Sequence, residues 1–249
     1  MVSVRVLSHS FGAKQVLKDI NLEVGKGEIV AIMGSSGGGK TTLLKCISGL
    51  IVPTKGEVQV AGINAVQDPE SARRKMGMVF QSAALFDYLN VEDNVLFGVR
   101  RWGRPSGGDQ RKRLEELLQT VGLQGTETLM PNELSGGMRK RVGIARALAM
   151  QPELMLYDEP TTGLDPVTVY TIDQLIVDVR NKFQVTSLVV SHDVSSVFRT
   201  ADRIAFLDKG ELIFVGGIEE FQASREKAIL ELVKKSEARA LQEILRETH

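Results

Sequence analysis

The stretch Gly34-Ser35-Ser36-Gly37-Gly38-Gly39-Lys40-Thr41-Thr42 follows a short apolar run at residues 29–33 and precedes a segment of helical character at residues 41–48. It fits the pattern G-x-x-x-x-G-K-[ST], whose glycines let backbone N–H groups curl around phosphate oxygens without Cβ clashes. The helix that follows presents the positive end of its dipole to the same anion. Strand, loop and helix in this order predict a phosphate-binding α/β core.

Two side chains of this stretch have specific chemistry. Lys40 supplies a mobile cation for the β- and γ-phosphates of a nucleotide, and the Thr41 hydroxyl can ligate Mg²⁺. The alternative is a flexible Gly/Ser turn, but average residue frequencies give the full pattern by chance in roughly one chain in a hundred of this length. The strand before it and the helix after it favour a nucleotide site further.

A second motif consists of two acids at the end of an apolar strand. Residues 154–157 are apolar, and Asp158 and Glu159 follow directly. Ligands of open parallel sheets lie at the carboxyl ends of the strands. There Asp158 can hold Mg²⁺ through its water shell, and Glu159 can act as general base on an attacking water. Acids in loops are usually just solvated, so this motif becomes informative only beside the phosphate loop.

Bulk composition excludes several classes of protein. The 249 residues include 31 Lys+Arg and 31 Asp+Glu, so no global basic field exists and we expect no nucleic-acid partner. The single cysteine, Cys46, fits a reducing compartment. The first residues lack the order of a signal peptide, and no apolar run approaches the ~20 residues of a membrane span. We therefore expect a soluble protein that reaches a membrane only through a partner.

A third motif resembles the signature sequence of a known protein family. Leu134-Ser135-Gly136-Gly137-Met138 resembles LSGGQ, the signature sequence of the ABC ATPases. It precedes a helix, so Ser135 and the two glycine N–H groups form a second phosphate site at a helix start. In that family the signature of one subunit caps the ATP held by the phosphate loop of the other, which implies ATP as cofactor and a head-to-tail homodimer. Met138 departs from the usual Gln, which puts in doubt any contact made by the Gln side chain.

Four further matches follow in the order of the family. Gln81 resembles the Q-loop glutamine, which reaches Mg²⁺ and the attacking water. Gly163-Leu164-Asp165 resembles the D-loop that links the two sites, and His192 resembles the switch histidine that contacts the γ-phosphate. Phe11 stands where the family stacks an aromatic ring on adenine. Taken singly, His192 reads as a surface residue and Phe11 as core, but their joint order supports the resemblance, which implies an ATP-hydrolysing enzyme.

The domain plan combines this resemblance with the pattern of the chain. We expect an ABC ATPase domain over residues 1–220, with a parallel sheet, an antiparallel β-subdomain and a helical insert at about 83–150, and a helical extension at 221–249. Within the insert, Arg101 to Asp109 is rich in Gly, Arg and Pro and predicts a surface loop. From about Ile218 the tail has helical periodicity, with one apolar face. That face comprises Ile229, Val233, Leu241, Ile244 and Leu245.

Residues 80–95 and Met138 also resemble the Mla/Mce-type lipid-transport ATPases. This implies a multispanning permease, an Mce-domain substrate-binding protein, phospholipid as cargo, and a peripheral position on the cytoplasmic face of the inner membrane. Leu85, Phe86 and Tyr88 are placed to line a groove for a permease helix, or alternatively pack inside the insert. The C-terminal helix either wraps the partner subunit or folds back on its own domain.

Other functions remain open at this point. The chain could serve an ABC importer or exporter with a different cargo, or a soluble ABC ATPase of cluster assembly. DNA-repair and chromosome types carry a long coiled-coil insertion, whereas only about 90 residues without a heptad run lie between Lys40 and Ser135. Translation types usually carry two cassettes in one chain. A P-loop kinase predicts neither the second phosphate site nor an ATP-dependent dimer.

Overall fold

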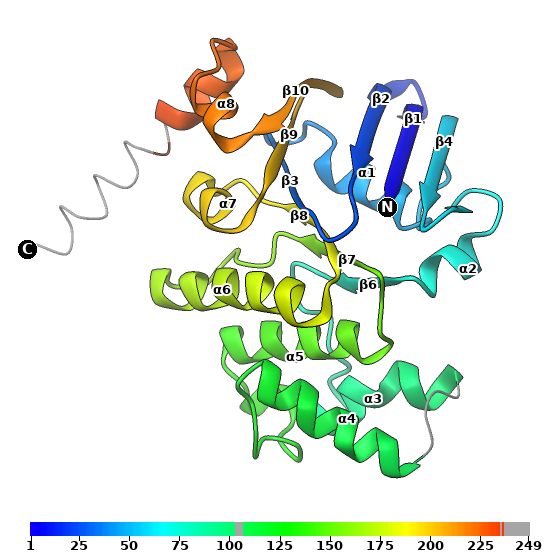
Figure 1. Ribbon diagram of the computed structural model, residues 1–249, viewed down its shortest axis with the longest axis vertical. Coiled ribbons are helices and arrows are strands. Elements are labelled where there is room, and N and C mark those ends of the chain that lie inside the picture. The colour runs from blue at the N-terminus through cyan, green and yellow to red at the C-terminus, as the bar shows by residue number, and fades with distance from the viewer. Residues whose placement is uncertain (103–106, 235, 237–249) are drawn as a thin grey trace, which may run out of the picture.

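The computed structural model describes residues 1–102, 107–234 and 236, whose strands form two sheets (Figure 1). The smaller sheet is antiparallel, with the strand order β2-β1-β4-β5. Val2 and Val4 alternate with more exposed residues, which gives this sheet one buried face. Its strands are β1 (Val2–Phe11), β2 (Lys14–Val24), β4 (Lys55–Val60) and β5 (Ile63–Asn64).

The larger sheet has the order β10-β9-β3-β8-β7-β6, and its strands are parallel except for β10 at one edge. Every residue of β3 is buried, as the uninterrupted apolar run predicts for a central parallel strand. The strands are β3 (Ile29–Gly34), β6 (Met76–Val79), β7 (Leu154–Asp158), β8 (Thr186–Val190), β9 (Arg203–Asp208) and β10 (Glu211–Gly217).

The two faces of the larger sheet bury two different cores. Val30 and Ile32 of β3 pack with α1 and the smaller sheet, whereas Ile29, Ala31 and Met33 pack with the helices of the opposite face. Those helices descend from α7 through α6 and α5 to α3 and α4 in Figure 1. The helices are α1 (Lys40–Ile47), α2 (Pro69–Arg73), α3 (Val91–Trp102), α4 (Gly107–Thr120), α5 (Gly136–Ala149), α6 (Pro166–Phe183), α7 (Val194–Thr200) and α8 (Ile218–Gln222).

Parallel strand direction brings three loops to one edge of this sheet. Ile32 of β3 and Asp158 of β7 both pair with Val190 of β8, so the three strands end at nearly the same level. β3 leads into the phosphate loop, β7 leads into Glu159, and β8 leads into His192. The fold therefore gathers these segments where ligands of parallel sheets bind.

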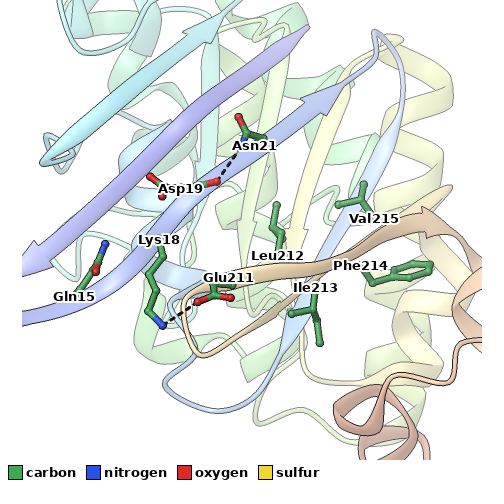
Figure 2. A pocket seen from close by; sticks show the side chains of 9 residues that line it. All are labelled: Gln15, Lys18, Asp19, Asn21, Glu211, Leu212, Ile213, Phe214 and Val215. Atoms are coloured by element: carbon green, nitrogen blue, oxygen red, sulfur yellow. Dashed lines mark hydrogen bonds and ion pairs between the residues drawn. The ribbon is translucent and has the colours of Figure 1, made fainter.

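The two sheets meet at a seam between β2 and β10. Asp208-Lys209-Gly210 forms the predicted turn between β9 and β10, and the Lys18 N–H donates to the Gly210 carbonyl at 2.8 Å. Figure 2 shows the Lys18–Glu211 ion pair, 3.0 Å long, beside a hollow of about 650 Å³. Gly210 has φ +85°, and a Cβ there would lie 2.5 Å from the Val16 carbonyl oxygen. Only glycine permits this close approach.

Two predictions within the insert are wrong in part. Helical character was expected from about Ala83, but the helix begins at Val91, because Ala83 and Ala84 have φ of +62° and +46°. The loop predicted at Arg101 to Asp109 is shorter at both ends, since α3 continues to Trp102 and α4 begins at Gly107. The two helices therefore extend into a stretch whose glycine and proline content predicted a loop.

The tail, for which helical periodicity was predicted from about Ile218, contains a break in its helical structure. α8 ends at Gln222, and a second helix occupies residues 227–234. In that helix Ile229 is buried and Val233 packs against the core, as the periodicity predicts. Leu241, Ile244 and Leu245 lie outside the described residues. Among the described residues, no helix combines the length and the apolar character needed to cross a membrane.

Candidate nucleotide site

The glycines of the phosphate loop are required by packing as well as by any ligand. Gly34 has φ +143°, and a Cβ there would fall 1.8 Å from the carbonyl oxygen of Leu207. Gly39 caps α1 with φ +104°, and its Cβ would lie 2.8 Å from Leu17 Cδ2. Because Leu207 of β9 and Leu17 of β2 lie so close to the loop, Gly34 and Gly39 cannot be replaced by a larger residue without a clash.

Lys40 is the first residue of α1, and its side chain contacts the backbone of the phosphate loop. Its Nζ donates to the carbonyl oxygens of Gly34 at 3.0 Å and Ser35 at 2.9 Å. Burial lowers the pKa of Lys40, whereas the carboxylates of Glu159 and Asp158 favour its charged form. The loop thus holds a cation that faces two acids across the site.

Asp158 is paired with the first turn of α1. The Thr41 hydroxyl donates to Asp158 Oδ1 at 3.1 Å. Burial raises the pKa of Asp158, the hydrogen bond from Thr41 opposes that rise, and the charge of Glu159 adds to it. A hydroxyl and a carboxyl oxygen side by side are ligands of the kind that Mg²⁺ takes.

Glu159 is held by two neighbouring side chains. Its Oε2 lies 2.7 Å from His192 Nδ1 and accepts from the Thr162 hydroxyl at 2.9 Å. Burial acts to raise the pKa of Glu159, but the bonds from His192 and Thr162 and the His192 charge outweigh it, so this pKa lies below its usual value. The bond to Glu159 in turn raises the pKa of His192 against the effect of burial. Glu159 is therefore ionised at neutral pH, the form that accepts a proton.

Many of the predicted site residues line one cavity of about 340 Å³. Two lining residues, Val16 and Thr162, escaped the sequence analysis. Gly34, Ser35, Gly38 and Asp158 lie next to the cavity without lining it. The predicted residues that line it are Ser36, Gly37, Gly39, Lys40, Thr41, Thr42, Gln81, Glu159 and His192.

Three predicted elements lie outside the cavity. Phe11 is 53% exposed on β1, with its ring centroid 4.6 Å from that of His9. Ser135 caps α5 by accepting the Met138 N–H at 3.2 Å, ahead of Gly136 and Gly137. The third is Asp165, which caps α6 through the Thr168 N–H at 3.0 Å. None of these residues lines the cavity of the same copy.

Lys140 is a further site residue that sequence reasoning missed. It lies on α5, and its Nζ donates to the backbone carbonyls of Gln81 and, at 3.3 Å, Glu159. A signal was present: Gly137, Lys140 and Ile144 follow the helical spacing of the buried face of α5. Lysine is rarely buried unless it is paired, so its place on the buried face of a helix indicates a specific role.

The chain is similar to known proteins over most of its length. The family model described as ABC transporter matches residues 17–162. The L-cystine import ATP-binding protein TcyC of Bacillus subtilis is 40% identical over 235 residues, which cover 91% of this chain and 95% of that protein. The intermembrane phospholipid transport ATP-binding protein MlaF of Haemophilus influenzae is 39% identical over 238 residues, covering 94% and 90%. Among solved structures, the dimeric ATP-binding cassette MJ0796 in a post-hydrolysis state with ADP and Pi gives a TM-score of 0.79 at 36% identity, covering 88% of this chain and 99% of that one.

Proposed function

Since the chain belongs to the ABC transporter family, as an ATP-hydrolysing subunit, we propose that it powers phospholipid transport through a membrane permease. It acts as a head-to-tail homodimer on the cytoplasmic face of the inner membrane, and an Mce-domain substrate-binding protein completes the machine. One observation carries the catalytic part of this proposal. Lys40, Thr41, Glu159 and His192 come from three different strand ends and line a single cavity.

Hydrolysis at this site depends on positioning and charge stabilisation. Lys40 and the N–H groups of the loop hold the β- and γ-phosphates. Ionised Glu159 accepts a proton from the attacking water, and Thr162 fixes its carboxylate. His192 donates through Nδ1 to Glu159, and in its protonated form, which the raised pKa of the ring favours, Nε2–H is free to donate to the γ-phosphate.

Mg²⁺ would be held by Thr41, Asp158 and Gln81. The residues fit this ion, because the Thr41 hydroxyl and the Asp158 carboxylate stand 3.1 Å apart and Gln81 lines the same cavity as Thr41. In the described part of the chain, no group of three or more His, Cys, Asp or Glu side chains is placed to hold a metal. The set of Thr41, Asp158 and Gln81 is small for a metal site, which suits Mg²⁺ because this ion keeps several waters and phosphate oxygens as ligands. When bound, the ion neutralises negative charge on the phosphates.

The start of α5 serves the second copy in this proposal. Ser135 and the N–H groups of Gly136 and Gly137 form a helix N-terminus suited to an anion, yet they lie outside the cavity of their own copy. We assign them to the ATP of the twin subunit. Asp165 then links the two sites through the D-loop, and exposed Phe11 stacks on adenine.

The permease is proposed to dock beside the segment after Gln81. Leu85 lines a hollow of about 520 Å³, and the neighbouring Tyr88 is 72% exposed. Leu85 also packs in part against the hydrophobic core, and Phe86 packs against Phe97 with ring centroids 4.4 Å apart, as in the packed alternative. The docking surface is therefore Leu85, Asp87 and Tyr88, next to the start of α5.

An amino acid is a second candidate for the cargo. Lipid is supported by the resemblance of residues 80–95 and Met138 to Mla/Mce-type ATPases and by the MlaF relative. Import of an amino acid such as cystine is supported equally by TcyC, whose identity to this chain is 40%. Catalytic geometry does not distinguish them, because an ATPase subunit usually makes no contact with cargo.

Affinity purification of the chain from its own membranes tests the proposal. We expect a multispanning permease and an Mce-domain protein to copurify, with phospholipid detected in the complex by mass spectrometry. The Tyr88→Glu variant, designed to lose the permease, gives the background of free lipid. An amino-acid-binding partner would replace the lipid proposal with amino-acid import. Recovery of no membrane protein would favour a non-transport ATPase.

A further inference from the structure

Lys140 connects three elements of the site. It is only 5% exposed, and its two hydrogen-bond acceptors in the described part of the chain are the backbone carbonyls of Gln81 and Glu159. Its own helix, α5, begins directly after Ser135. A buried ammonium is unfavourable unless its donors are satisfied, and bonds from a cation to a carbonyl are stronger than neutral ones. The contact therefore fixes both carbonyls firmly relative to α5.

The backbone of Glu159 needs such support. Its φ is +51°, a conformation that L-residues other than Gly rarely adopt. The Glu159 N–H donates to the Val190 carbonyl at 3.0 Å, and the Glu159 carbonyl accepts from Lys140. β8 and α5 thus hold this residue from both sides. This backbone conformation fixes where the side chain of Glu159 starts, and His192 and Thr162 then hold its carboxylate.

The same lysine fixes the segment that leaves β6. Gln81 is one of the residues that line the nucleotide cavity, and its backbone carbonyl accepts from Lys140. Further along, Arg146 of α5 donates to the carbonyls of Ala83 and Ala84 at 2.8 and 2.7 Å. The strained turn after Gln81 is therefore attached to α5 at two points.

We propose that Lys140 is a positioning residue for ATP hydrolysis, which holds the Glu159 and Gln81 backbones in register with the start of α5. This inference rests on the proposed function, in which Glu159 is the base and the start of α5 caps the ATP of the twin subunit. Through Lys140, closure of the second phosphate site onto ATP also sets the base and the Q-loop glutamine. Lys140 acts through these backbones and makes no contact with the nucleotide.

The test compares the replacement of Lys140 with the replacement of Arg141, its neighbour on the same helix. Lys140→Met removes the ammonium and keeps the apolar stem. Arg141→Met is the matched control, because Arg141 also donates to two carbonyls, those of Val121 at 3.1 Å and Gly122 at 2.9 Å, away from Glu159. We expect kcat of Lys140→Met to fall roughly 10- to 100-fold, with the KM for ATP within about threefold of wild type. Arg141→Met should keep both constants within about threefold.

Amide hydrogen exchange gives a second readout that needs no turnover. Lys140→Met should accelerate exchange in peptides covering residues 81–84 and 159–162, whereas Arg141→Met should leave them unchanged. For Lys140→Gln, which keeps a neutral donor, kcat and the exchange rates should lie between those of wild type and Lys140→Met. This variant replaces Lys140→Met in the test if the methionine variant does not fold. Unchanged kcat and exchange in the Lys140 variants, or equal losses in the control, would overturn the inference. Absence of wild-type hydrolysis would defeat the proposed function, while the exchange comparison would still decide the role of Lys140.

Discussion

Nδ1 of His192 lies 2.7 Å from Oε2 of Glu159. The two residues follow neighbouring parallel strands, β8 and β7, and meet at the cavity that also holds Lys40. Their hydrogen bond raises the pKa of His192 and helps to lower that of Glu159 below its usual value. The proposed base and the proposed phosphate-contacting histidine are therefore one titrating unit.

This pair should make the stability of the protein depend on pH. The pKa of His192 is raised above 6.5, so its contribution is complete below that value and is lost as pH rises through the folded-state pKa. The pKa of Glu159 is lowered below 4.5, so its contribution is complete above that value and is lost as pH falls through the folded-state pKa. The pair therefore stabilises the fold most between pH 4.5 and 6.5.

Denaturant unfolding of His192→Gln checks this sign. The difference in free energy of unfolding between wild type and variant should shrink as pH is raised from about 6 to about 9. Parallel stability curves over this range would show that the pair does not form in solution. Glu159→Gln serves as the second arm of a double-mutant cycle.

Lys40→Ala should abolish ATP hydrolysis, with a loss of at least roughly 100-fold, because it removes the cation placed on the β- and γ-phosphates. Phosphate release from the purified protein measures the effect. Lys45→Ala, which changes another lysine of α1 outside the cavity lining, is the control. Normal turnover by Lys40→Ala would contradict the assignment of the loop.

Glu159→Gln should bind ATP and hydrolyse it roughly 10²- to 10⁴-fold more slowly, because the amide cannot accept the proton from water. The variant should accumulate a closed dimer in the presence of ATP, detectable by size-exclusion chromatography with light scattering. Wild-type turnover in this variant would remove Glu159 from the role of base.

Ser135→Arg should block dimer closure and leave nucleotide binding by one copy intact. The long side chain would occupy the helix start that the twin ATP needs. Ser135→Ala separates this effect from loss of the helix cap, which is worth about 0.5–2 kcal/mol of stability. A fluorescent nucleotide measures binding, and light scattering measures the dimer. Closure of Ser135→Arg with ATP would contradict the proposed arrangement.

Tyr88→Glu should uncouple the permease and spare nucleotide binding, because its side chain is exposed and lies outside the cavity. Phe86→Glu is an instructive comparison, since it places a charge against Phe97 and should destabilise the insert. ATPase assays with and without the copurified permease measure coupling. Loss of nucleotide binding in Tyr88→Glu would place this segment in the core instead.

The sequence predicted the phosphate loop and the acid pair because each is a local pattern on an apolar strand. Lys40 and Glu159 were identified from their position after residues 29–33 and 154–157, and parallel strands then brought them together. The ends of strands of this kind are fixed by burial, which sequence patterns record well.

Contacts between distant segments could not be read in this way. Lys140 reaches Gln81 and Glu159 across three elements, and nothing local in its neighbourhood indicates the two carbonyls. The irregular backbone at Ala83 and Ala84 is likewise stabilised from outside, by Arg146, and so escapes a reading based on helix propensity. Tertiary hydrogen bonds overrode local preference at each of these positions.

A structure of Glu159→Gln with ATP and Mg²⁺ would reveal whether two copies bind each nucleotide between them. We expect two copies head to tail, with the γ-phosphate between Lys40 of one copy and Ser135 of the other, and with residue 159 facing the terminal phosphate. An ATP-bound assembly in which these two elements face apart, or in which residue 159 is remote from the terminal phosphate, would contradict this arrangement.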